Sequence, residues 1–374
     1  MRNYEKEMAE GCRGVARVDA FRASLVLLCF GFVGLLSSCN YVAPEGEDSW
    51  QNYVDGGMFV TASPSLSPIG DRMVYASACT GHGDIYVMNG TSVGPVRLTH
   101  NDDFEASPMF TPDGKRIVFA REHDKFRHVW IMNSNGSHES QLTQGATLDD
   151  PQSLSSDGRY LLFSRSLWTG GLGRTSKMYL MRIDVVAGKS IHVGDIAILS
   201  PDSRFVIYSD AGELWRLELD GKERNRRRIY GTGWPTDTSE DGRLILIMRP
   251  IAGKAWTGEE EIWVLDTVTK SEKLLGIGHS ATLFGANRDN VLFLAGADQI
   301  PYVTTIDGGM TKRIDCPSGY KTSVSASWDG RGVLVGSYAA GQRSDSSVIF
   351  IDFEGLRATT IASIACDGST FRSP

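Results

Sequence analysis

The sequence predicts an all-β fold, a β-propeller of four-stranded blades, from a repeated turn phrase and an evenly spaced aromatic residue. A phrase close to Ser-Pro-Asp-Gly-Lys-Arg recurs along the chain, and each copy precedes a short apolar strand. A second strand with an aromatic residue follows. From Tyr86 to Ile349 six such intervals cover 263 residues, which is about 44 residues each. That period suits one blade, and short strands repeated at a fixed period favour a propeller over a sandwich.

The turn phrase has a direct physical explanation. Pro fixes φ and Gly accepts a positive φ, so Pro-Asp-Gly closes a tight turn between two antiparallel strands. The strand after each turn is apolar and rich in β-branched residues, as expected of a strand. Clear copies occupy residues 67–75, 108–120 and 155–163, weaker ones residues 201–208 and 240–246, a degraded sixth copy residues 287–293, and a seventh residues 328–334.

The aromatic-bearing strands give the predicted number of blades. One residue marks each strand: Tyr86, Trp130, Tyr179, Trp215, Trp263, Tyr302 and Ile349. Seven blades are predicted, with six as the alternative, because the fourth turn lacks its glycine and the sixth has lost the Pro-Asp-Gly phrase. Ring closure has two alternatives, in which residues 58–61 pair with the last blade or residues 358–361 complete that blade unaided.

The N-terminal segment predicts export. Arg13, Arg17 and Arg22 precede an apolar stretch over residues 23–36, which is too short to span a bilayer comfortably and ends in Leu-Ser-Ser-Cys39. This ending resembles the lipobox of bacterial lipoproteins. The resemblance implies a signal peptide over residues 1–38, a lipid anchor on Cys39, a polar tether to residue 56 and a propeller over residues 57–374. The alternative is an ordinary secretory signal with an incidental cysteine.

The lipoprotein resemblance also implies a location. Asn40 stands where an Asp would favour retention in the inner membrane. Outer-membrane sorting is therefore expected in a two-membrane bacterium. The propeller would be held at the membrane through its lipid anchor, on the periplasmic side or exposed at the surface.

Three of the six cysteines fall in the predicted propeller, at Cys79, Cys316 and Cys366. Cys366 follows the last blade, so a disulfide bond to Cys79 or Cys316 would clasp the ring shut in an oxidising compartment. Buried free thiols are the alternative. Since the sequence contains no Cys-x-x-Cys pair, structural zinc is not expected.

The charge balance disfavours nucleic acid as a partner. The whole chain has a formal net charge of −7. Without residues 1–38, which hold five basic and four acidic side chains, 33 Lys and Arg face 41 Asp and Glu, so the net charge is −8. One basic cluster lies between two predicted blades, as a solvated loop or outer strand or as a contact for an anionic lipid or glycan: Lys222, Arg224, Arg226, Arg227 and Arg228.

Acidic residues precede the first strand of several predicted blades. In a propeller these strands begin around the central channel, so the side chains are expected to converge on one mouth and bind a cation or a basic partner segment. The alternative is that each Asp bonds to the backbone of its own turn. No cofactor is predicted beyond this optional divalent cation. The candidate residues are His100, Asp102, Asp103, Glu105, Asp149, Asp150, Asp195, Asp237 and His279.

The repeat resembles that of the TolB-type β-propellers. Besides the turn and the aromatic strand, Arg-Leu-Thr at residues 97–99 and Gln-Leu-Thr at residues 141–143 stand directly ahead of the next blade, as in that family. The resemblance implies a periplasmic or envelope-associated propeller that binds other proteins, among them a peptidoglycan-associated lipoprotein. Two departures are the lipoprotein-type signal and the lack of room for the α/β domain that precedes the TolB propeller.

These observations predict a non-catalytic docking platform in the cell envelope. The sequence contains no His-Glu-x-x-His and no Walker-type phosphate loop. Similar repeats also occur in oligogalacturonate lyases and in the propellers of prolyl-oligopeptidase-like enzymes. The alternative function is therefore a carbohydrate-active or peptidase-associated propeller with a metal ion at the central channel.

Overall fold

Most of the described chain consists of β-strands. The computed structural model describes residues 62–77, 83–90, 94–168, 174–184, 189–220, 225–253, 259–285, 287–296, 299–316, 320–326, 331–338, 345–365 and 370–371. No α-helix occurs in these ranges, and consequently no helix of a length and hydrophobicity that would cross a membrane. The predicted signal peptide, Cys39 and the tether lie outside the described residues.

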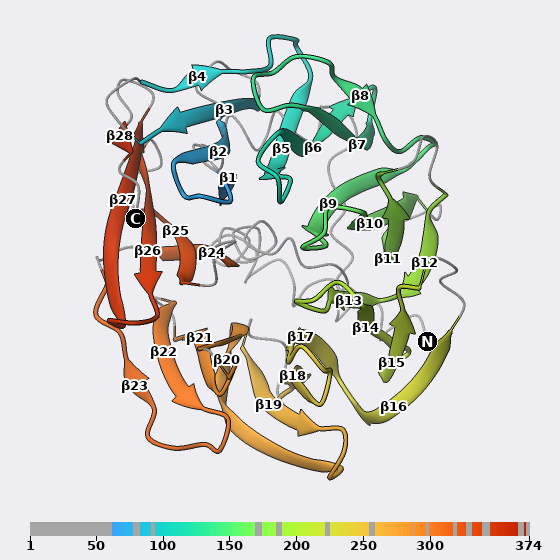
Figure 1. Cartoon of the computed structure of the whole chain (residues 1–374), viewed down its shortest axis with the longest axis vertical. Coiled ribbons are helices and arrows are strands. Elements are labelled where there is room, and N and C mark those ends of the chain that lie inside the picture. The colour runs from blue at the N-terminus through green and yellow to red at the C-terminus, as the bar shows by residue number, and fades with distance from the viewer. Residues whose placement is uncertain are drawn as a thin grey trace, which may run out of the picture. The chain divides into compact units, whose positions relative to one another are not determined.

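The first strands follow one another as antiparallel meanders around a common centre (Figure 1). Blade 1 contains β1 (Ala62–Leu66), β2 (Arg72–Ser77), β3 (Asp84–Asn89) and β4 (Val96–Arg97). Blade 2 contains β5 (Phe104–Phe110), β6 (Arg116–His123), β7 (Phe126–Asn133) and β8 (Ser140–Gln141). Blade 3 contains β9 (Leu148–Leu154), β10 (Tyr160–Trp168), β11 (Arg174–Arg182) and β12 (Ile191–Gly194).

The remaining strands continue the pattern. Blade 4 contains β13 (Ile196–Leu199), β14 (Phe205–Asp210), β15 (Glu213–Glu218) and β16 (Arg226–Thr232). Blades 5 and 6 contain β17 (Trp234–Thr238), β18 (Leu244–Pro250), β19 (Glu260–Asp266), β20 (Ser271–Phe284), β21 (Asn290–Ala295), β22 (Ile300–Thr305) and β23 (Lys312–Arg313). Blade 7 contains β24 (Tyr320–Ala326), β25 (Gly332–Tyr338), β26 (Asp345–Asp352), β27 (Arg357–Ala365) and β28 (Thr370–Phe371).

Strand β20 belongs to two blades. Its first part, to Gly278, pairs with β19 as the outer strand of blade 5, and its second part, from His279, pairs with β21 as the inner strand of blade 6. Divided at this point, the described strands are consistent with seven blades. The prediction of an all-β propeller is confirmed.

Each blade has a pair of facing side chains at the equivalent central position of its second and third strands. The marker residue of the aromatic strand lies in the third strand and faces a residue of the second strand. The pairs are Tyr75 and Tyr86, Phe119 and Trp130, Phe163 and Tyr179, Tyr208 and Trp215, Ile247 and Trp263, Phe293 and Tyr302, and Val335 and Ile349. Four of these are stacked rings with centroids 5.7–6.5 Å apart. Cross-strand aromatic pairs of this kind stabilise a sheet.

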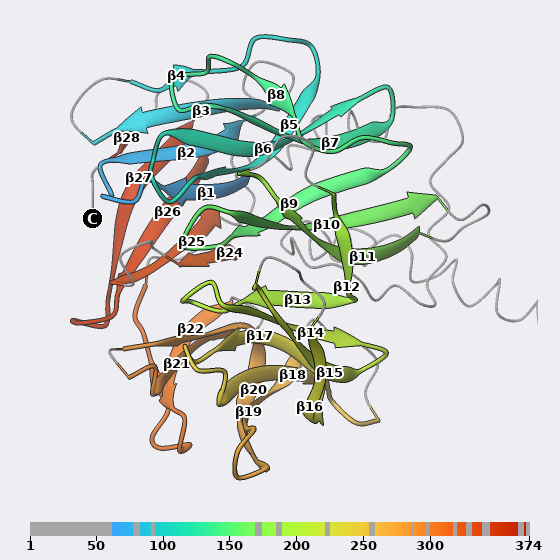
Figure 2. The same ribbon diagram turned by 45° about the vertical axis from the view of Figure 1, so that its right-hand side comes forward.

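Buried apolar clusters join every blade to the next. Side chains alternate between the two faces of a strand, so β2 directs Val74 toward blade 2 and Tyr75 toward blade 7. The cluster that closes the ring joins Leu66 and Tyr75 of blade 1 to Phe350 and Ile361 of blade 7, and Figure 2 shows β26 and β27 beside β1 and β2. Ring closure therefore depends on apolar packing between the first and last blades.

The last blade is completed by its own C-terminal strands. Residues 358–361 lie in β27, which pairs with β26 along its length. Strand β28 then pairs with the other edge of β27. This arrangement is the second of the two predicted ways of closing the ring. Residues 58–61, which the first alternative requires, lie outside the described residues.

The turn phrase folds the same way in successive blades. The Thr111 hydroxyl donates to Asp113 Oδ1 (2.6 Å) and accepts a hydrogen bond from Arg116 N (3.1 Å), while Asp113 Oδ1 accepts one from Lys115 N (3.1 Å). The same bonds recur in the turns that begin at Ser155, Ser200 and Ser239. These side-chain bonds satisfy backbone N–H groups that the turn leaves outside the strand ladder.

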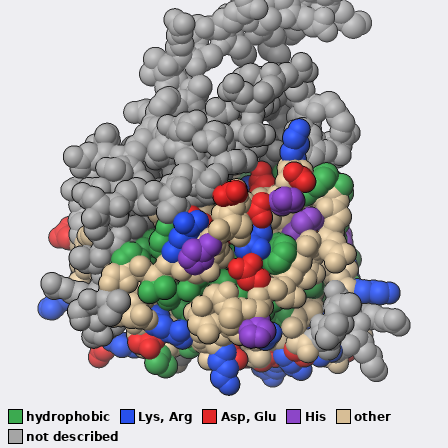
Figure 3. Space-filling model, turned by 90° about the horizontal axis from the view of Figure 1, so that it is seen from above, with side chains coloured by type: hydrophobic (Ala, Val, Ile, Leu, Met, Phe, Trp, Pro, Cys, Tyr) green, Lys and Arg blue, Asp and Glu red, His purple; other side chains and the backbone are tan. Residues whose placement is uncertain are grey.

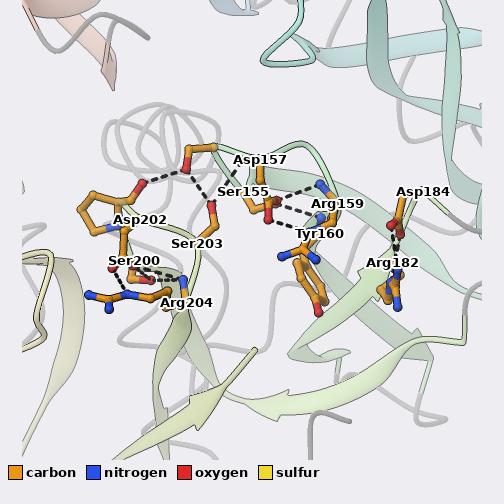
Figure 4. Close-up of polar contacts among 12 residues, drawn as sticks. Ser155, Asp157, Arg159, Tyr160, Arg182, Asp184, Ser200, Asp202, Ser203 and Arg204 are labelled. Atoms are coloured by element: carbon orange, nitrogen blue, oxygen red, sulfur yellow. Dashed lines mark hydrogen bonds and ion pairs between the residues drawn. The ribbon is translucent and has the colours of Figure 1, made fainter. Parts of the chain in front are cut away.

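The fourth turn departs from the others at one position. The residue after Asp has a positive φ, 65° at Gly114 and 70° at Gly158, but Ser203 takes this place with a φ of 61°. The Ser203 hydroxyl lies 2.7 Å from that of Ser156 in the third turn and accepts a hydrogen bond from Asp157 N (3.3 Å) (Figure 4). The fourth turn thus lacks a glycine that adopts a positive φ freely, but the serine side chain links blade 4 to blade 3 by hydrogen bonds.

Two substitutions at Ser203 should distinguish how much its hydrogen bonds and its positive φ each change the free energy of unfolding. We expect Ser203→Ala to lower the free energy of unfolding by about 1 kcal/mol, because it removes the link and keeps a Cβ at positive φ. Ser203→Gly should lower it less, because glycine adopts a positive φ without the cost of about 1–2 kcal/mol that a Cβ brings. Urea unfolding of the full chain measures both. A larger loss for the glycine variant would contradict this explanation.

Candidate functional site at the upper face

The candidate residues lie where the inner strands begin. Blades 1 to 6 have four antiparallel strands each, so every inner strand starts at the same face of the ring, here called the upper face. The Ser-Pro-Asp-Gly turns lie at the opposite face, here called the turn face. Residues 98–103 and 142–147 connect blades 1 to 2 and 2 to 3. The connections from blade 3 to 4 and from blade 4 to 5 are one residue each, β20 has none, and residues 314–319 separate blade 6 from blade 7. The longer connections of the upper face therefore lie between blades 1 and 2, 2 and 3, and 6 and 7.

Glycine permits the short connections. A Cβ on Gly194 would collide with the carbonyl oxygen of Ser209 in the next blade, and one on Gly278 with that of Leu294. Both residues lie at the junction between an outer strand and the following inner strand. The outer strand can pass this close to the next blade only without a side chain.

Glu105 is the most enclosed candidate. Its carboxylate is fully buried and accepts hydrogen bonds of 2.8 Å each from the Thr99 hydroxyl, the Asn101 amide and Arg121 Nε. The Thr99 hydroxyl also accepts a hydrogen bond from Ile85 N (2.9 Å). The threonine of the Arg-Leu-Thr motif therefore ties the outer part of blade 1 to the inner strand of blade 2.

Burial changes the acidity of Glu105. Removal from water raises the pKa of this carboxyl from 4.5 to about 6, although Asn101, Thr99 and Arg121 all act in the opposite direction. Arg121 also contacts Glu139 (2.7 Å) and lies over the Trp130 ring, 4.5 Å from its centroid. The carboxylate and the guanidinium thus form a packed unit within blade 2.

Blade 3 repeats this unit. Asp149 is fully buried, faces Arg165 across the strand pair, and accepts two hydrogen bonds of 2.7 Å from its guanidinium. Arg165 in turn covers the rings of Phe163 and Tyr179 at 5.2 and 5.1 Å. In both blades the arginine stands two residues after the aromatic residue of the second strand. These carboxylates are therefore matched to a cation inside their own blade.

Asp150 connects two blades. Arg127 of β7 donates hydrogen bonds to Asp150 Oδ1 (2.9 Å) and to Glu122 Oε2 (2.7 Å). Its backbone N–H bonds to Thr147 O (3.0 Å) at the start of blade 3. The two carboxylates raise the pKa of Arg127 despite its burial. This cation therefore holds the third strand of blade 2 against the inner strand of blade 3.

Asp195 and Asp237 also have partners within the protein. Asp195 pairs with Lys177 of β11 and accepts a hydrogen bond from Ala211 N (3.1 Å). Asp237 pairs with Arg288 and accepts hydrogen bonds of 2.8 Å each from the Thr282 hydroxyl and Leu283 N in β20. Each aspartate thus joins its own inner strand to a neighbouring blade.

His100, Asp102 and Asp103 lie in the loop between blades 1 and 2. His100 and Asp102 are exposed. The Asp103 backbone N–H donates a hydrogen bond to Asn101 Oδ1 in the same loop (2.8 Å). The Asp103 carboxylate lies 2.7 Å from His123 Nδ1 and raises the pKa of that imidazole. This loop supplies the exposed polar groups of the upper face.

His279 is the ninth candidate and is buried. It opens the second part of β20, where the register shifts between His279 and Thr282 and Ser280 takes a φ of 54°. Its Nδ1 lies 2.9 Å from the Ser280 hydroxyl. Removal from water lowers the pKa of His279 from 6.5 to about 4, so the ring is neutral at pH 7. A buried neutral imidazole at this position belongs to the packing of blade 6.

The nine residues therefore do not form one cluster. No group of three or more His, Cys, Asp or Glu side chains in the described part of the chain is arranged to hold a metal ion. The partners that sequence reasoning missed are cations: Arg121, Arg127, Arg165, Lys177 and Arg288. Two of them were detectable, because Arg121 and Arg165 occupy the same position of the repeat.

One of the two predicted disulfide bonds, Cys316 to Cys366, is absent from the structure. Cys316 is half-buried and carries a free thiol, so it does not bond to Cys366 in this structure. Cys79 and Cys366 lie outside the described residues.

The rim seen in Figure 3 carries Lys and Arg, Asp and Glu, and His side chains interspersed with one another.

Comparison with known proteins supports the resemblance of the repeat to TolB-type propellers. Residues 51–233 match the family model of the TolB beta propeller domain. The repeats there are TolB-like. This TolB-like segment includes blades 1 to 4 and the motifs at residues 97–99 and 141–143. No curated protein matches the sequence.

Solved structures of similar fold are distant in sequence. A puromycin-hydrolyzing peptidase of Mycobacterium tuberculosis is 14% identical, with 86% of this chain and 55% of that chain covered and a TM-score of 0.59. An oligogalacturonate lyase of Vibrio parahaemolyticus is 14% identical, with 80% and 93% covered and a TM-score of 0.56. An oligogalacturonate lyase in complex with manganese is 13% identical, with 75% and 88% covered and a TM-score of 0.55. At these identities the similarity is one of fold alone.

The raised pKa of Glu105 predicts a pH-dependent stability. A folded pKa of about 6 against an ordinary 4.5 means that its contribution is present below pH 4.5 and is lost as the pH rises through 6. Relative to Glu105→Gln, the wild type should lose about 2 kcal/mol of unfolding free energy between about pH 4.5 and pH 7. Denaturant unfolding across this range measures the difference. Parallel pH profiles of the two proteins would contradict the prediction.

His279 predicts the opposite slope. Its folded pKa of about 4 lies below the ordinary 6.5, so its contribution is present above pH 6.5 and is lost as the pH falls toward 4. Relative to His279→Asn, the wild type should lose about 2 kcal/mol between about pH 7 and pH 5. Chemical-shift titration of the imidazole provides a direct check. A midpoint near the ordinary value would show that the ring is not held neutral by burial.

Proposed function

We propose that this protein is a non-catalytic docking platform of the cell envelope. The observation that carries the proposal is that five acidic candidates of the inner strands are paired with cations of the protein itself: Glu105, Asp149, Asp150, Asp195 and Asp237. Charges matched in this way stiffen the ring, because each pair joins neighbouring strands or blades. A rigid ring with longer loops on one part of its upper face is suited to holding a partner.

We further propose that the protein is a lipoprotein of the outer membrane, on its periplasmic side or exposed at the surface. The support is the sequence of residues 23–39, with an apolar core followed by Leu-Ser-Ser-Cys39. Acylation of Cys39 would attach the chain to the membrane, and a polar tether would separate it from the propeller. Cleavage after residue 38 produces the mature protein in this proposal.

The proposed partners are envelope proteins, including a peptidoglycan-associated lipoprotein. The support is the TolB-like repeat over residues 51–233 and the exposed loop of His100 and Asp102 on the upper face. A net charge of −7 does not favour nucleic acid. A carbohydrate-active or peptidase-associated function has less support, because the similarity to those enzymes is one of fold and the acidic candidates already serve as partners of Arg and Lys.

The proposal is tested by cross-linking the full-length protein in its native membrane fraction and identifying its neighbours by mass spectrometry. We expect specific envelope proteins bound to a bait whose Cys39 is acylated. Asp102→Arg reverses an exposed charge on the upper face and should reduce their recovery several-fold. Glu354→Arg makes the same charge change in the exposed turn between β26 and β27 on the turn face, and it is the matched control.

Two results would overturn the proposal. One is a soluble, unacylated protein that cross-links to no envelope protein. The other is turnover of oligogalacturonate or of a peptide that requires an added divalent metal and disappears when the upper face is altered. Equal loss of partners in Asp102→Arg and Glu354→Arg would assign docking to a surface other than the upper face.

A further inference from the structure

Strand β16 has one of the longest outer edges among the described strands. The outer strands β4, β8 and β23 have two residues each and β12 has four, whereas β16 has seven. It pairs with β15 on one side, and no described strand pairs with its other edge. The pairing with β15 is regular over residues 226–228 and shifts register before Thr232. The regular part of the edge presents a row of backbone N–H and C=O groups to which another strand can bind.

Two other outer strands have edges of comparable length, β27 and the outer part of β20. Strand β28 pairs with β27 in blade 7. The outer part of β20 lies against the following turn of blade 6, where Lys273 donates to Asp307 O and Gly308 packs on the lysine side chain. Strand β16 differs from the outer part of β20 in its side chains. All seven side chains of β16 are exposed or half-exposed and the first three are exposed arginines, whereas Leu275 and Gly278 of β20 are buried.

The exposed edge is basic. Arg226, Arg227 and Arg228 are consecutive and exposed in a chain whose net charge is −7. The Arg226 guanidinium donates to His192 O (2.8 Å) in blade 3, and that of Arg228 pairs with Glu213 (2.7 Å). The Arg227 guanidinium has neither a hydrogen bond nor an ion pair within the described residues. The Arg227 guanidinium is thus available to pair with a carboxylate of a partner.

The arginines point to both faces of the sheet. Arg226 lies over the Tyr208 ring at 5.8 Å, on the side of blade 3, while Ile229 packs into the cluster shared with blade 5. Because successive side chains of a strand alternate, Arg227 shares the blade 5 side with Ile229, opposite Arg226. An added strand would therefore meet positive charge on both of its faces.

We infer that the β16 edge binds an acidic extended segment of a partner protein as an added strand. This inference rests on the proposed docking function and names the surface and the chemistry of one partner. Backbone hydrogen bonds to the free edge supply pairing, and adjacent carboxylates on the partner face Arg227 on one side and Arg226 or Arg228 on the other. An extended peptide suits this edge better than an anionic lipid surface, because a lipid offers no backbone to pair with it.

The test uses the full-length protein in detergent and a fluorescent peptide rich in Thr and Val with glutamates at neighbouring central positions. We expect saturable binding that weakens as salt increases. Arg227→Glu should weaken it about threefold or more, because an attractive cross-strand pair becomes repulsive. Lys312→Glu, on the exposed outer strand β23, makes the same charge change and should leave the affinity unchanged. A peptide of the same composition with a central proline should not bind, because proline cannot donate to the ladder.

Three outcomes would overturn the inference. They are equal binding of the proline peptide, equal affinities of Arg227→Glu and Lys312→Glu, and binding of phosphatidylglycerol vesicles that depends on Arg227 without any binding of the acidic peptide. The cross-linking experiment separates this inference from the docking function. If Arg227→Glu retains the envelope partners of the wild type and the peptide does not bind, docking stands and the β16 edge is not its surface. If the wild type has no partners, the docking function itself fails.

Discussion

The structure depends on apolar packing between neighbouring blades. Each blade is a single sheet whose second and third strands are apolar on both faces, so a blade alone would leave the apolar side chains of both faces in water. Within the described residues each interface between consecutive blades has its own buried cluster, and the last cluster joins blade 7 to blade 1. Closing the ring removes the two faces that an open row of blades would expose. The blades therefore depend on one another for stability.

Polar side chains adjust this packing at the upper face. The pairs of Glu105 with Arg121 and of Asp149 with Arg165 lie against aromatic rings, where a carboxylate alone would be strongly unfavourable. Such pairs contribute less to net stability than to geometry, since the desolvation cost offsets much of the attraction. Their effect is to fix how each inner strand sits against the second strand of its blade. This fixed geometry is what a docking surface requires.

The sequence predicted the features that recur in every blade and missed those that occur in single blades. The turn phrase and the aromatic residue specify local backbone and a central pair, so the blade period and the marker residues of each third strand were predicted correctly. The carboxylates were expected to meet at one mouth, but their partners depend on the register between strands and on neighbouring blades. Lys177 and Arg288, for example, lie in other strands than Asp195 and Asp237. The continuous course of β20 was also missed, because it depends on the close approach that Gly278 allows.

The division between repeated and particular features indicates where binding properties can differ among propellers of this kind. Positions that pack between blades or pair within a blade are constrained by every neighbour, so a change there affects the ring. The loop at residues 98–103 and the outer edge of β16 are constrained on one side only. Their exposed charges have opposite signs, with Asp102 on the loop and Arg227 on the edge. Two surfaces of opposite charge on one rigid ring would allow it to hold two partners of different chemistry at once.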